Sequence, residues 1–410
     1  MRRFFCVTYG LLVLACGLLL GAVGYVSAVL PDAITVGQNQ AVQVGRFIQG
    51  QPIKGEDSSL SAVSQKTGNH YRSQLNLLGF IPVKEVAVTV SETRSVMVCG
   101  TPFGIKLYTD GVLVVGLQDV TTAAGNVNPA AAAGVCLGDT ILSVNGEEVT
   151  SNRDLSRLIN ASQGKRITLR LRRDGVEFSA AFTPVRPADE SGYKAGIWVR
   201  DSSAGVGTLT FYDPTSGVFA GLGHPVCDVD TGEAMPLSGG QVVPARVFGV
   251  TKSTAGIPGE LKGTFEPGVL GSLSRNGQNG LYGTLTTLPS PAVSLPVAHR
   301  QQVQEGRAQI LATLDGTQPR YYDVVVEQVR YGGATARNMV VRITDPELIN
   351  LAGGIVQGMS GSPLIQDGKL IGAVTHVFIN DPQRGYAIFA EDMLSTVDVV
   401  AQQIALDKAS

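Results

Sequence analysis

Residues 353–377 read GGIVQGMSGSPLIQDGKLIGAVTHV, and the rest of the chain is best understood from this stretch. Ser360 stands between glycines and is followed by an apolar pair, a polar turn at 366–369 and a second apolar run. This pattern predicts a tight loop that leads into a β-hairpin. Glycines beside a serine let the backbone turn sharply, expose the hydroxyl and direct amide N–H groups toward a bound carbonyl. The stretch therefore predicts a serine suited to acyl transfer.

A serine alone is a weak nucleophile and needs a base. The chain has four histidines. His224 ends an apolar run and precedes a loop, where a side chain can be held rigidly and still face solvent, so it is the first candidate. His376 lies on the strand after the serine hairpin and competes with it. His70 and His299 stand beside polar loop residues and look incidental.

Composition favours a mainly β protein. The 410 residues include 50 glycines and only 16% charged residues, with scattered valine, isoleucine and threonine, which is typical of short strands with tight turns. The length predicts two to three domains. The net charge of −2 lacks the basic footprint of nucleic-acid binders, so nucleic acid is not an expected partner.

The N-terminus carries an apolar segment within residues 1–30. Arg2 and Arg3 precede an uncharged run of 27 residues, Phe4 to Leu30. This run exceeds a signal-peptide core and suffices to span a bilayer, so it predicts a single-pass anchor with its start in the cytoplasm. A removable signal cut near Ala28 is the alternative. Both place the main body beyond the membrane.

Residues 31–95 are interpreted as a spacer and a leading strand. The part up to Asn69 is polar and has few large apolar groups, so it is not expected to bury a core. Val86, Val88 and Val90 then alternate with smaller residues, which predicts a half-exposed strand.

Residues 96–186 form a small predicted domain. A helix is expected after Ser151, which stands at capping-box spacing from Asp154. Two strands should meet at the turn 173–175. After a charged linker, 187–194, short apolar strands alternate with Gly, Pro and Asn turns through 195–410, which predicts an all-β sandwich or barrel with one late helix at 391–404.

The cysteines give little framework. Cys6 and Cys16 lie in the apolar N-terminus, which leaves Cys99, Cys136 and Cys227. These three are interpreted as small buried hydrophobes, with a Cys99–Cys136 bridge as the alternative. His224 and Cys227 show a metal-ligand spacing but lack further clustered ligands, so no metal site is expected. No cofactor motif is visible.

The run at 128–149, NPAAAAGVCLGDTILSVNGEEV, resembles a bacterial PDZ domain. The resemblance implies that the loop Phe103, Gly104 and Ile105 presents N–H groups to a peptide C-terminus, which joins the neighbouring strand edge by β-augmentation. Alternatively, the groove is filled by the chain itself or only positions the next domain.

The order His224, Asp345, Ser360 is similar to that of trypsin-like serine proteases with two β-barrels. More closely, the chain resembles the stage IV sporulation protein B family of signalling serine peptidases. The resemblance covers the apolar N-terminus, the PDZ segment, Gly207 to Phe211, Gly223-His224, and 358–363 through 372–382. It implies a fold of membrane anchor, PDZ domain and trypsin-like double β-barrel peptidase domain.

The resemblance also implies function. Such a serine endopeptidase cleaves itself and a membrane-bound protein in the space between forespore and mother cell, which releases an intramembrane protease and activates a late sigma factor. By carry-over, Ser360 is the nucleophile, His224 the general base and Asp345 the group that orients His224. The N–H groups of Gly358 and Ser360 would form the oxyanion hole.

Two features depart from the trypsin-like pattern. Asp345 stands only 15 residues before Ser360, and the Asp-Pro step at 345–346 is also a helix-start signal. Other carboxylates between His224 and Ser360 are Asp228, Asp230, Asp315 and Asp323. Met359 replaces the aspartate that receives a freed N-terminus in trypsin, so that mode of activation is not expected.

Two alternatives of other classes remain at this point. A PDZ adaptor would use its β-domain only as a scaffold in an envelope complex, and Ser360 would then have no role. A cysteine peptidase would use Cys227, which lacks the glycine context of Ser360.

Overall fold

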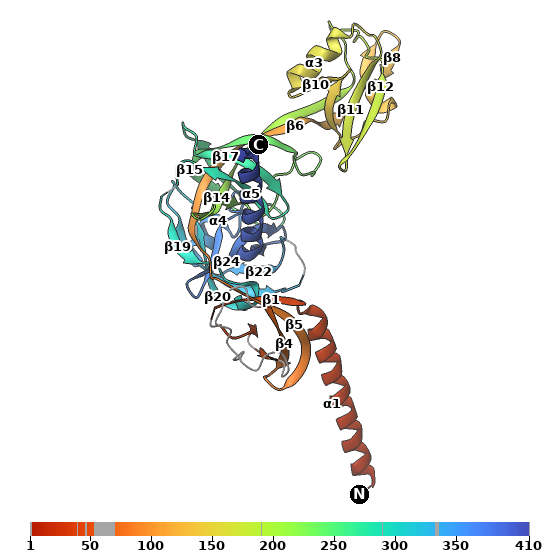
Figure 1. The fold of residues 1–410 in the computed structure, drawn as a ribbon. Coiled ribbons are helices and arrows are strands. Elements are labelled where there is room, and N and C mark those ends of the chain that lie inside the picture. The colour runs from red at the N-terminus through yellow and green to blue at the C-terminus, as the bar shows by residue number, and fades with distance from the viewer. Residues whose placement is uncertain are drawn as a thin grey trace.

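The computed structural model describes residues 2–38, 40–45, 47–52, 70–189, 191–288, 290–332 and 336–409. The molecule is elongated (Figure 1). A long N-terminal helix leads to a small sheet, the two β-barrels follow in the middle, and a small α/β domain projects at the far end.

The N-terminal helix α1 (Arg2–Val29) ends against a five-stranded sheet. The amine of Lys84 donates to the carbonyl of Leu30 at 2.6 Å and pairs with Asp32 at 2.8 Å, which holds the helix end to the sheet. Within the described part of the chain, no helix combines the length and the hydropathy needed to cross a bilayer.

The spacer interpretation of residues 31–95 is wrong for the described residues. The sheet contains β1 (Ala33–Gly37), β2 (Gln43–Val44), β3 (Ile48–Pro52), β4 (His70–Leu77) and β5 (Ile81–Ser91) in the order β1-β5-β4-β3-β2. Its core contains Ile34, Val36 and Val44 together with the predicted alternating valines of β5. The apolar residues of β1 and β2 are too few to predict a strand from their own pattern. They are buried because these strands join a sheet with strands that lie far away in the sequence. Residues 53–69 of the expected spacer lie outside the described residues.

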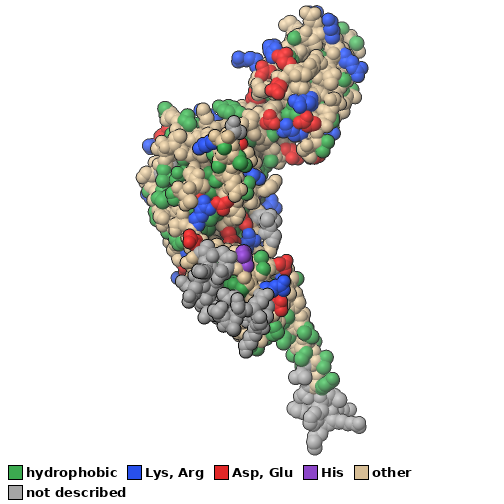
Figure 2. Space-filling model, in the orientation of Figure 1, with side chains coloured by type: hydrophobic (Ala, Val, Ile, Leu, Met, Phe, Trp, Pro, Cys, Tyr) green, Lys and Arg blue, Asp and Glu red, His purple; other side chains and the backbone are tan. Residues whose placement is uncertain are grey.

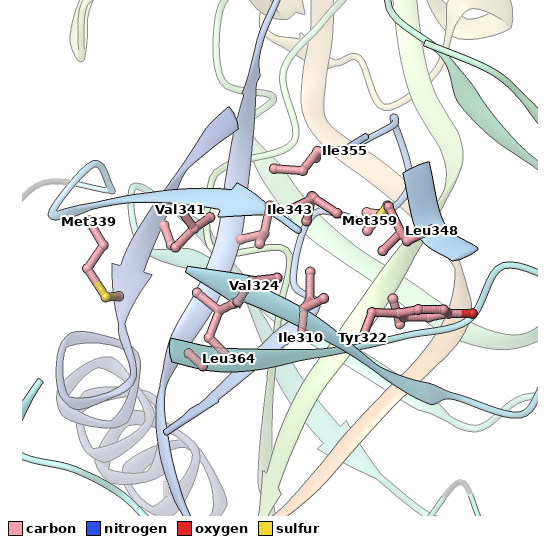
Figure 3. Close-up of a cluster of buried hydrophobic side chains, with 14 of the residues drawn as sticks. Ile310, Tyr322, Val324, Met339, Val341, Ile343, Leu348, Ile355, Met359 and Leu364 are labelled. Carbon is pink, nitrogen blue, oxygen red and sulfur yellow. The ribbon is translucent and has the colours of Figure 1, made fainter. Parts of the chain in front are cut away.

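The C-terminal barrel is a closed ring of six strands in the order β20-β21-β22-β25-β24-β23. Its strands are β20 (Gly306–Ala312), β21 (Arg320–Val329), β22 (Met339–Ile343), β23 (Pro363–Gln366), β24 (Lys369–Phe378) and β25 (Asp381–Phe389). Inward side chains such as Ile310, Val324 and Val341 fill it (Figure 3). The expected serine hairpin is β23 and β24, whose turn residue Asp367 has φ 49°.

A second barrel precedes the C-terminal barrel in the chain, and it is called here the ring barrel. Strand pairing passes from β6 to β13, β14, β18, β17 and β15, and β15 pairs with β6 again. The strands are β6 (Ser95–Leu117), β13 (Ile197–Asp213), β14 (Val218–Gly221), β15 (Leu237–Thr251), β17 (Gly271–Gly277) and β18 (Gly280–Leu285). Flanking strands are β16 (Glu260–Phe265) and β19 (Val293–Pro296). Two barrels are present, but the first takes β6 from before residue 195.

The final helix α5 (Ala390–Ala409) includes the predicted helix and joins the barrels. Its buried Met393 and Val397 pack in one cluster with Phe211 and Tyr282 of the ring barrel and Ile388 of the C-terminal barrel. The helix therefore helps to fix the two barrels, and the loops between them, relative to each other.

The small domain is inserted between β6 and β13. It contains β7 (Val120–Thr122), β8 (Gly125–Val127), α2 (Pro129–Ala132), β9 (Thr140–Val144), β10 (Glu147–Glu148), α3 (Asn152–Ala161), β11 (Ile167–Arg173) and β12 (Val176–Phe182). Ser151 caps α3 as predicted, since its hydroxyl accepts from Asp154 N–H at 3.1 Å. On the face shown in Figure 2, positive and negative side chains are interspersed over this domain.

Candidate active site between the two barrels

The loop at 356–362, called here the Ser360 loop, is anchored by Met359. That side chain is fully buried in the core of the C-terminal barrel, near Leu348 and Ile343 (Figure 3). A charged residue could not occupy this position without a large desolvation cost. The departure from the trypsin-like aspartate thus has a structural reason: an apolar contact holds the loop where trypsin uses an ion pair.

Glycines shape the same loop. Gly358 and Gly361 have φ of 94° and 93°, a conformation that L residues rarely adopt. Between them, the Ser360 hydroxyl donates to the carbonyl of Thr375 at 2.8 Å. Ser360 is half-buried. The serine is thus presented at the surface of a rigid turn, with its hydroxyl directed at strand β24.

The N–H groups of Gly358 and Ser360 are available to a ligand. The neighbouring amides are occupied, because Met359 donates to Val356 at 3.1 Å and Gly361 donates to Val374 at 2.8 Å. Among the hydrogen bonds of the described residues, none uses the N–H of Gly358 or of Ser360. Two free donors flanking the serine hydroxyl are what an oxyanion hole requires.

His224 lies on the loop after β14, at the ring-barrel side of the site. Leu222 and Gly223 both have positive φ, 65° and 70°, and turn the chain toward β24. The approach is close, because a Cβ added to Gly223 would lie 2.9 Å from Cγ2 of Thr375. The sharp turn therefore delivers His224 to the strand whose carbonyl binds Ser360.

A single hydrogen bond orients the His224 ring. Its Nδ1 lies 2.7 Å from the carbonyl oxygen of Pro225. Because a carbonyl only accepts, Nδ1 carries the proton and Nε2 retains its lone pair. This is the tautomer that a general base needs. No hydrogen bond joins Ser360 to His224 in the described residues, since the Ser360 hydroxyl is bound to Thr375.

His376 completes the cluster. Its ring centroid lies 4.9 Å from that of His224, with the two rings tilted by 39°. Its Nδ1 is buried and without a hydrogen-bond partner. Burial, then the charges of His224 and Arg337, lower the pKa of His376 to about 4. A neutral, poorly basic imidazole is a packing surface for His224 and a weak competitor for the role of base.

The rate should depend on pH through His224. Burial lowers its pKa below the ordinary value of 6.5, and the bond to Pro225 opposes that effect. Since only the unprotonated ring can act as a base, we expect kcat/KM to rise with pH through a value below 6.5 and to be level at pH 7. The pH profile of peptide cleavage checks this, and an acid limb centred above 6.5 would contradict it.

The structure does not bring Asp345 to His224. Its carboxylate caps helix α4 (Pro346–Ala352), accepting from the N–H groups of Glu347 at 2.9 Å and Leu348 at 3.2 Å. It also accepts from Asp323 N–H at 3.2 Å. The orienting contact expected from Asp345 is made by the Pro225 carbonyl instead. The helix-start alternative describes the observed geometry.

Asp345→Asn distinguishes the two roles. Asparagine caps helices as well as aspartate does, so we expect this variant to keep its stability and its activity within about tenfold, whereas Asp345→Ala loses about 1 kcal/mol of stability. Chemical unfolding and cleavage assays measure both. A loss of activity near 10⁴-fold in folded Asp345→Asn would instead assign Asp345 the orienting role.

The remaining candidate side chains lie elsewhere. His70 binds Thr89 on the N-terminal sheet, and His299 pairs with Glu391 at 2.9 Å. Cys99, Cys136 and Cys227 are free thiols, of which Cys99 alone is buried, so the bridge does not form. Although Cys227 is exposed, partial desolvation of its thiol and then the charge of Glu233 raise its pKa, which disfavours the reactive thiolate.

The prediction of a peptide-binding loop at Phe103–Ile105 is wrong. These residues lie inside β6, where Phe103 and Ile105 are buried in the core of the ring barrel. Both edges of β6 are paired there, Gly104 with Val206 and with Val243. Backbone N–H groups inside a doubly paired strand cannot receive a carboxylate. Strand β6 passes through both domains, and residues 103–105 belong to its ring-barrel part.

A groove of about 660 Å³ on the small domain offers an open strand edge of the kind that was expected at residues 103–105. It lies between α3 and the start of β13, with Leu155 and Ile159 on one wall and Ile197 and Trp198 on the other. At Ile197 and Trp198, β13 pairs only with β6 in the described residues, so the edge facing α3 is open. An extended peptide could add here as a strand.

Parts of the chain match known protein families. Residues 191–394 match the family model of the SpoIVB peptidase S55, and residues 128–173 match that of the PDZ domain. A Mesorhizobium japonicum protein named as a zinc metalloprotease is 32% identical over 108 residues, 24% of this chain. The match spans only 29% of that relative's length.

Two solved structures are similar in part. The PDZ domain of the SdrC-like protein from Listeria monocytogenes is 20% identical and covers 22% of this chain and 87% of its own, with a TM-score of 0.19. The active form of the Rv3671c protease from M. tuberculosis is 14% identical and covers 48% and 74%, with a TM-score of 0.29.

The two family matches follow the architecture, because one lies within the inserted small domain and the other includes both His224 and Ser360. Residues 191–394 form a peptidase domain of the SpoIVB family, and the chain is a serine peptidase that also carries a PDZ domain.

Proposed function

We propose that Ser360 is the nucleophile and His224 the general base of this peptidase. The observation that carries the proposal is the meeting of two loops from different barrels at strand β24. The carbonyl of Thr375 accepts the Ser360 hydroxyl, and a Cβ added to Gly223 would lie 2.9 Å from Cγ2 of the same residue. The His224 ring packs on the ring of His376, the next residue of β24. The tautomer of His224 and the free N–H groups of the Ser360 loop supply the other requirements of acyl transfer.

In the proposed reaction, the Ser360 hydroxyl leaves Thr375 and attacks the substrate carbonyl while His224 Nε2 takes its proton. The N–H groups of Gly358 and Ser360 stabilise the oxyanion. The imidazolium then gives its proton to the leaving amine, and an acyl-enzyme forms. Water, deprotonated by His224, hydrolyses the acyl-enzyme and restores the serine. The Pro225 carbonyl holds the ring through both proton transfers.

The cellular role that we propose is sporulation signalling. The enzyme would cleave itself and a membrane-bound protein in the space between forespore and mother cell, so that an intramembrane protease is released and a late sigma factor is activated. The SpoIVB family match supports this role. The apolar run Phe4–Leu30 supports a single-pass anchor, with the body beyond the cytoplasmic membrane. A peptide C-terminus would occupy the groove beside α3.

Expression of the full chain beside Ser360→Ala tests the catalytic proposal. We expect discrete N-terminal trimming products, by gel and intact mass, from wild type only. Fluorophosphonate should label wild type at Ser360 and leave the variant unlabelled. If both proteins stay intact and neither is labelled although folded, Ser360 is not the nucleophile, and the PDZ adaptor becomes the better explanation.

A further inference from the structure

Two threonines of β13 hold the backbone of the Ser360 loop from the other barrel. The Thr208 hydroxyl donates to the carbonyl of Gly358 at 2.8 Å, and its N–H donates to the carbonyl of Ser360 at 3.1 Å. The Thr210 hydroxyl donates to the carbonyl of Gly361 at 2.7 Å. Thr208 is 3% exposed and Thr210 is fully buried. Three hydrogen bonds therefore cross from the ring barrel to the loop.

These bonds constrain the atoms that matter for chemistry. The carbonyls of Gly358 and Ser360 belong to the peptide planes on either side of the plane that carries the Ser360 N–H. The bonds from Thr208 hold both of these peptide planes, and the buried side chain of Met359 anchors the residue between them. The Ser360 N–H therefore has little freedom to change direction. Preorganised donors are effective because they need no reorientation during the reaction.

Close packing reinforces the constraint. A Cβ added to Gly361 would lie 2.1 Å from the carbonyl oxygen of Thr208, so the loop and β13 touch backbone to backbone. The Thr208 carbonyl also accepts from Leu222 N–H at 3.3 Å, two residues before His224. One residue of β13 is thus bonded to the loop of the nucleophile and to the loop of the base.

We propose that Thr208 and Thr210 are positioning residues that hold the Ser360 loop in its reactive conformation. The proposal rests on the role of Ser360 given above. Neither hydroxyl reaches substrate, because each is buried and donates to a main-chain carbonyl. They fix the direction of the N–H groups that would stabilise the oxyanion, and they hold the two barrels in a defined position relative to each other.

The test compares Thr208→Val and Thr210→Val, which keep the shape and remove the donor, with Thr208→Ser, which keeps a hydroxyl. The readout is the maximal rate of fluorophosphonate labelling at Ser360 in the full chain. We expect each valine variant to be about 10- to 100-fold slower at unchanged probe affinity, as for small misplacements of reacting groups. Thr208→Ser should recover most of the rate.

Thr101→Val is the matched control. Thr101 lies on β6 opposite Leu209, is equally buried at 4% exposure, and its hydroxyl has no hydrogen-bond partner. The same substitution there removes no contact with the Ser360 loop, so wild-type labelling is expected. This control separates the loss of a positioning bond from the general effect of valine in a buried strand.

The outcomes are distinguishable. Labelling of both valine variants at the wild-type rate, or equal slowing in Thr208→Ser and Thr208→Val, overturns the positioning role. Should Thr208→Val fail to fold, as judged by thermal unfolding, Thr208→Ala and Thr210→Val carry the comparison. If wild type itself is not labelled at Ser360, the proposed nucleophile is wrong and the positioning role falls with it.

Discussion

His224→Gln is expected to lower the rate of self-cleavage by about 10⁴-fold or more, as removal of a catalytic histidine does in serine peptidases. Glutamine is similar in size and can hydrogen-bond, but it cannot take the Ser360 proton. The fold should be unaffected, because the only hydrogen bond of the His224 side chain in the described residues is to its neighbour Pro225. Self-cleavage followed by gel and intact mass measures the rate, and thermal unfolding reports on the fold.

Two further substitutions, at His70 and His376, serve as comparisons for His224→Gln. His70→Gln is the control, because His70 is exposed and binds only Thr89 in the N-terminal sheet, and it should cleave like wild type. His376→Gln removes the imidazole that packs on His224 but leaves the base, so a loss much smaller than that of His224→Gln is expected. Retained activity in His224→Gln together with loss in His376→Gln would make His376 the base.

The parts of the site that sequence identified are those with a local signature. The glycines around Ser360 are encoded within a few residues, and this segment adopts the predicted tight loop and hairpin. The apolar run before His224 is strand β14, as its pattern indicates, but the sharp turn at 222–223 is not among the predictions. The family resemblance implies the N–H groups of Gly358 and Ser360 as oxyanion donors, and among the hydrogen bonds of the described residues none uses them. Short-range backbone constraints were therefore readable without any knowledge of the fold.

The parts that sequence missed depend on the backbone or on distant pairing. A main-chain carbonyl such as that of Pro225 exists at every residue, so nothing marks it as the partner of His224, whereas Asp345 attracts attention as a carboxylate. Thr208 and Thr210 lay within a recognised motif, but their bonds span about 150 residues of sequence. Their role depends on the packing of the two barrels against each other.

Pairing between strands distant in sequence also accounts for the incorrect prediction of the peptide-binding loop. Strands β6 and β13 each run through the small domain and the ring barrel, so one strand belongs to two cores. Phe103 and Ile105 show the alternation of a buried strand. Their partners on the adjacent strands β13 and β15 are more than 90 residues further along the chain. Domain boundaries drawn along the chain cannot represent an insertion between two paired strands.

Gly361→Ala should be among the most damaging small substitutions in the chain. The added Cβ would lie 2.1 Å from the Thr208 carbonyl oxygen and 2.5 Å from Leu222 N, and both are backbone atoms of the ring barrel. The residue also has φ 93°, which alanine rarely adopts. Overpacking and backbone strain together should lower the free energy of unfolding by about 3 kcal/mol or more.

Activity should fall further than stability alone explains. Relief of the clash must separate the Ser360 loop from β13, which moves the nucleophile relative to His224, and a shift near 1 Å costs about 100-fold. Gly368→Ala is the control, since Gly368 has φ 72° but nothing within 4 Å of an added Cβ. It should lose only about 1–2 kcal/mol from strain and remain active. Urea unfolding and fluorophosphonate labelling measure the two effects, and equal labelling of both alanine variants would show that contact between the barrels does not set the geometry of the site.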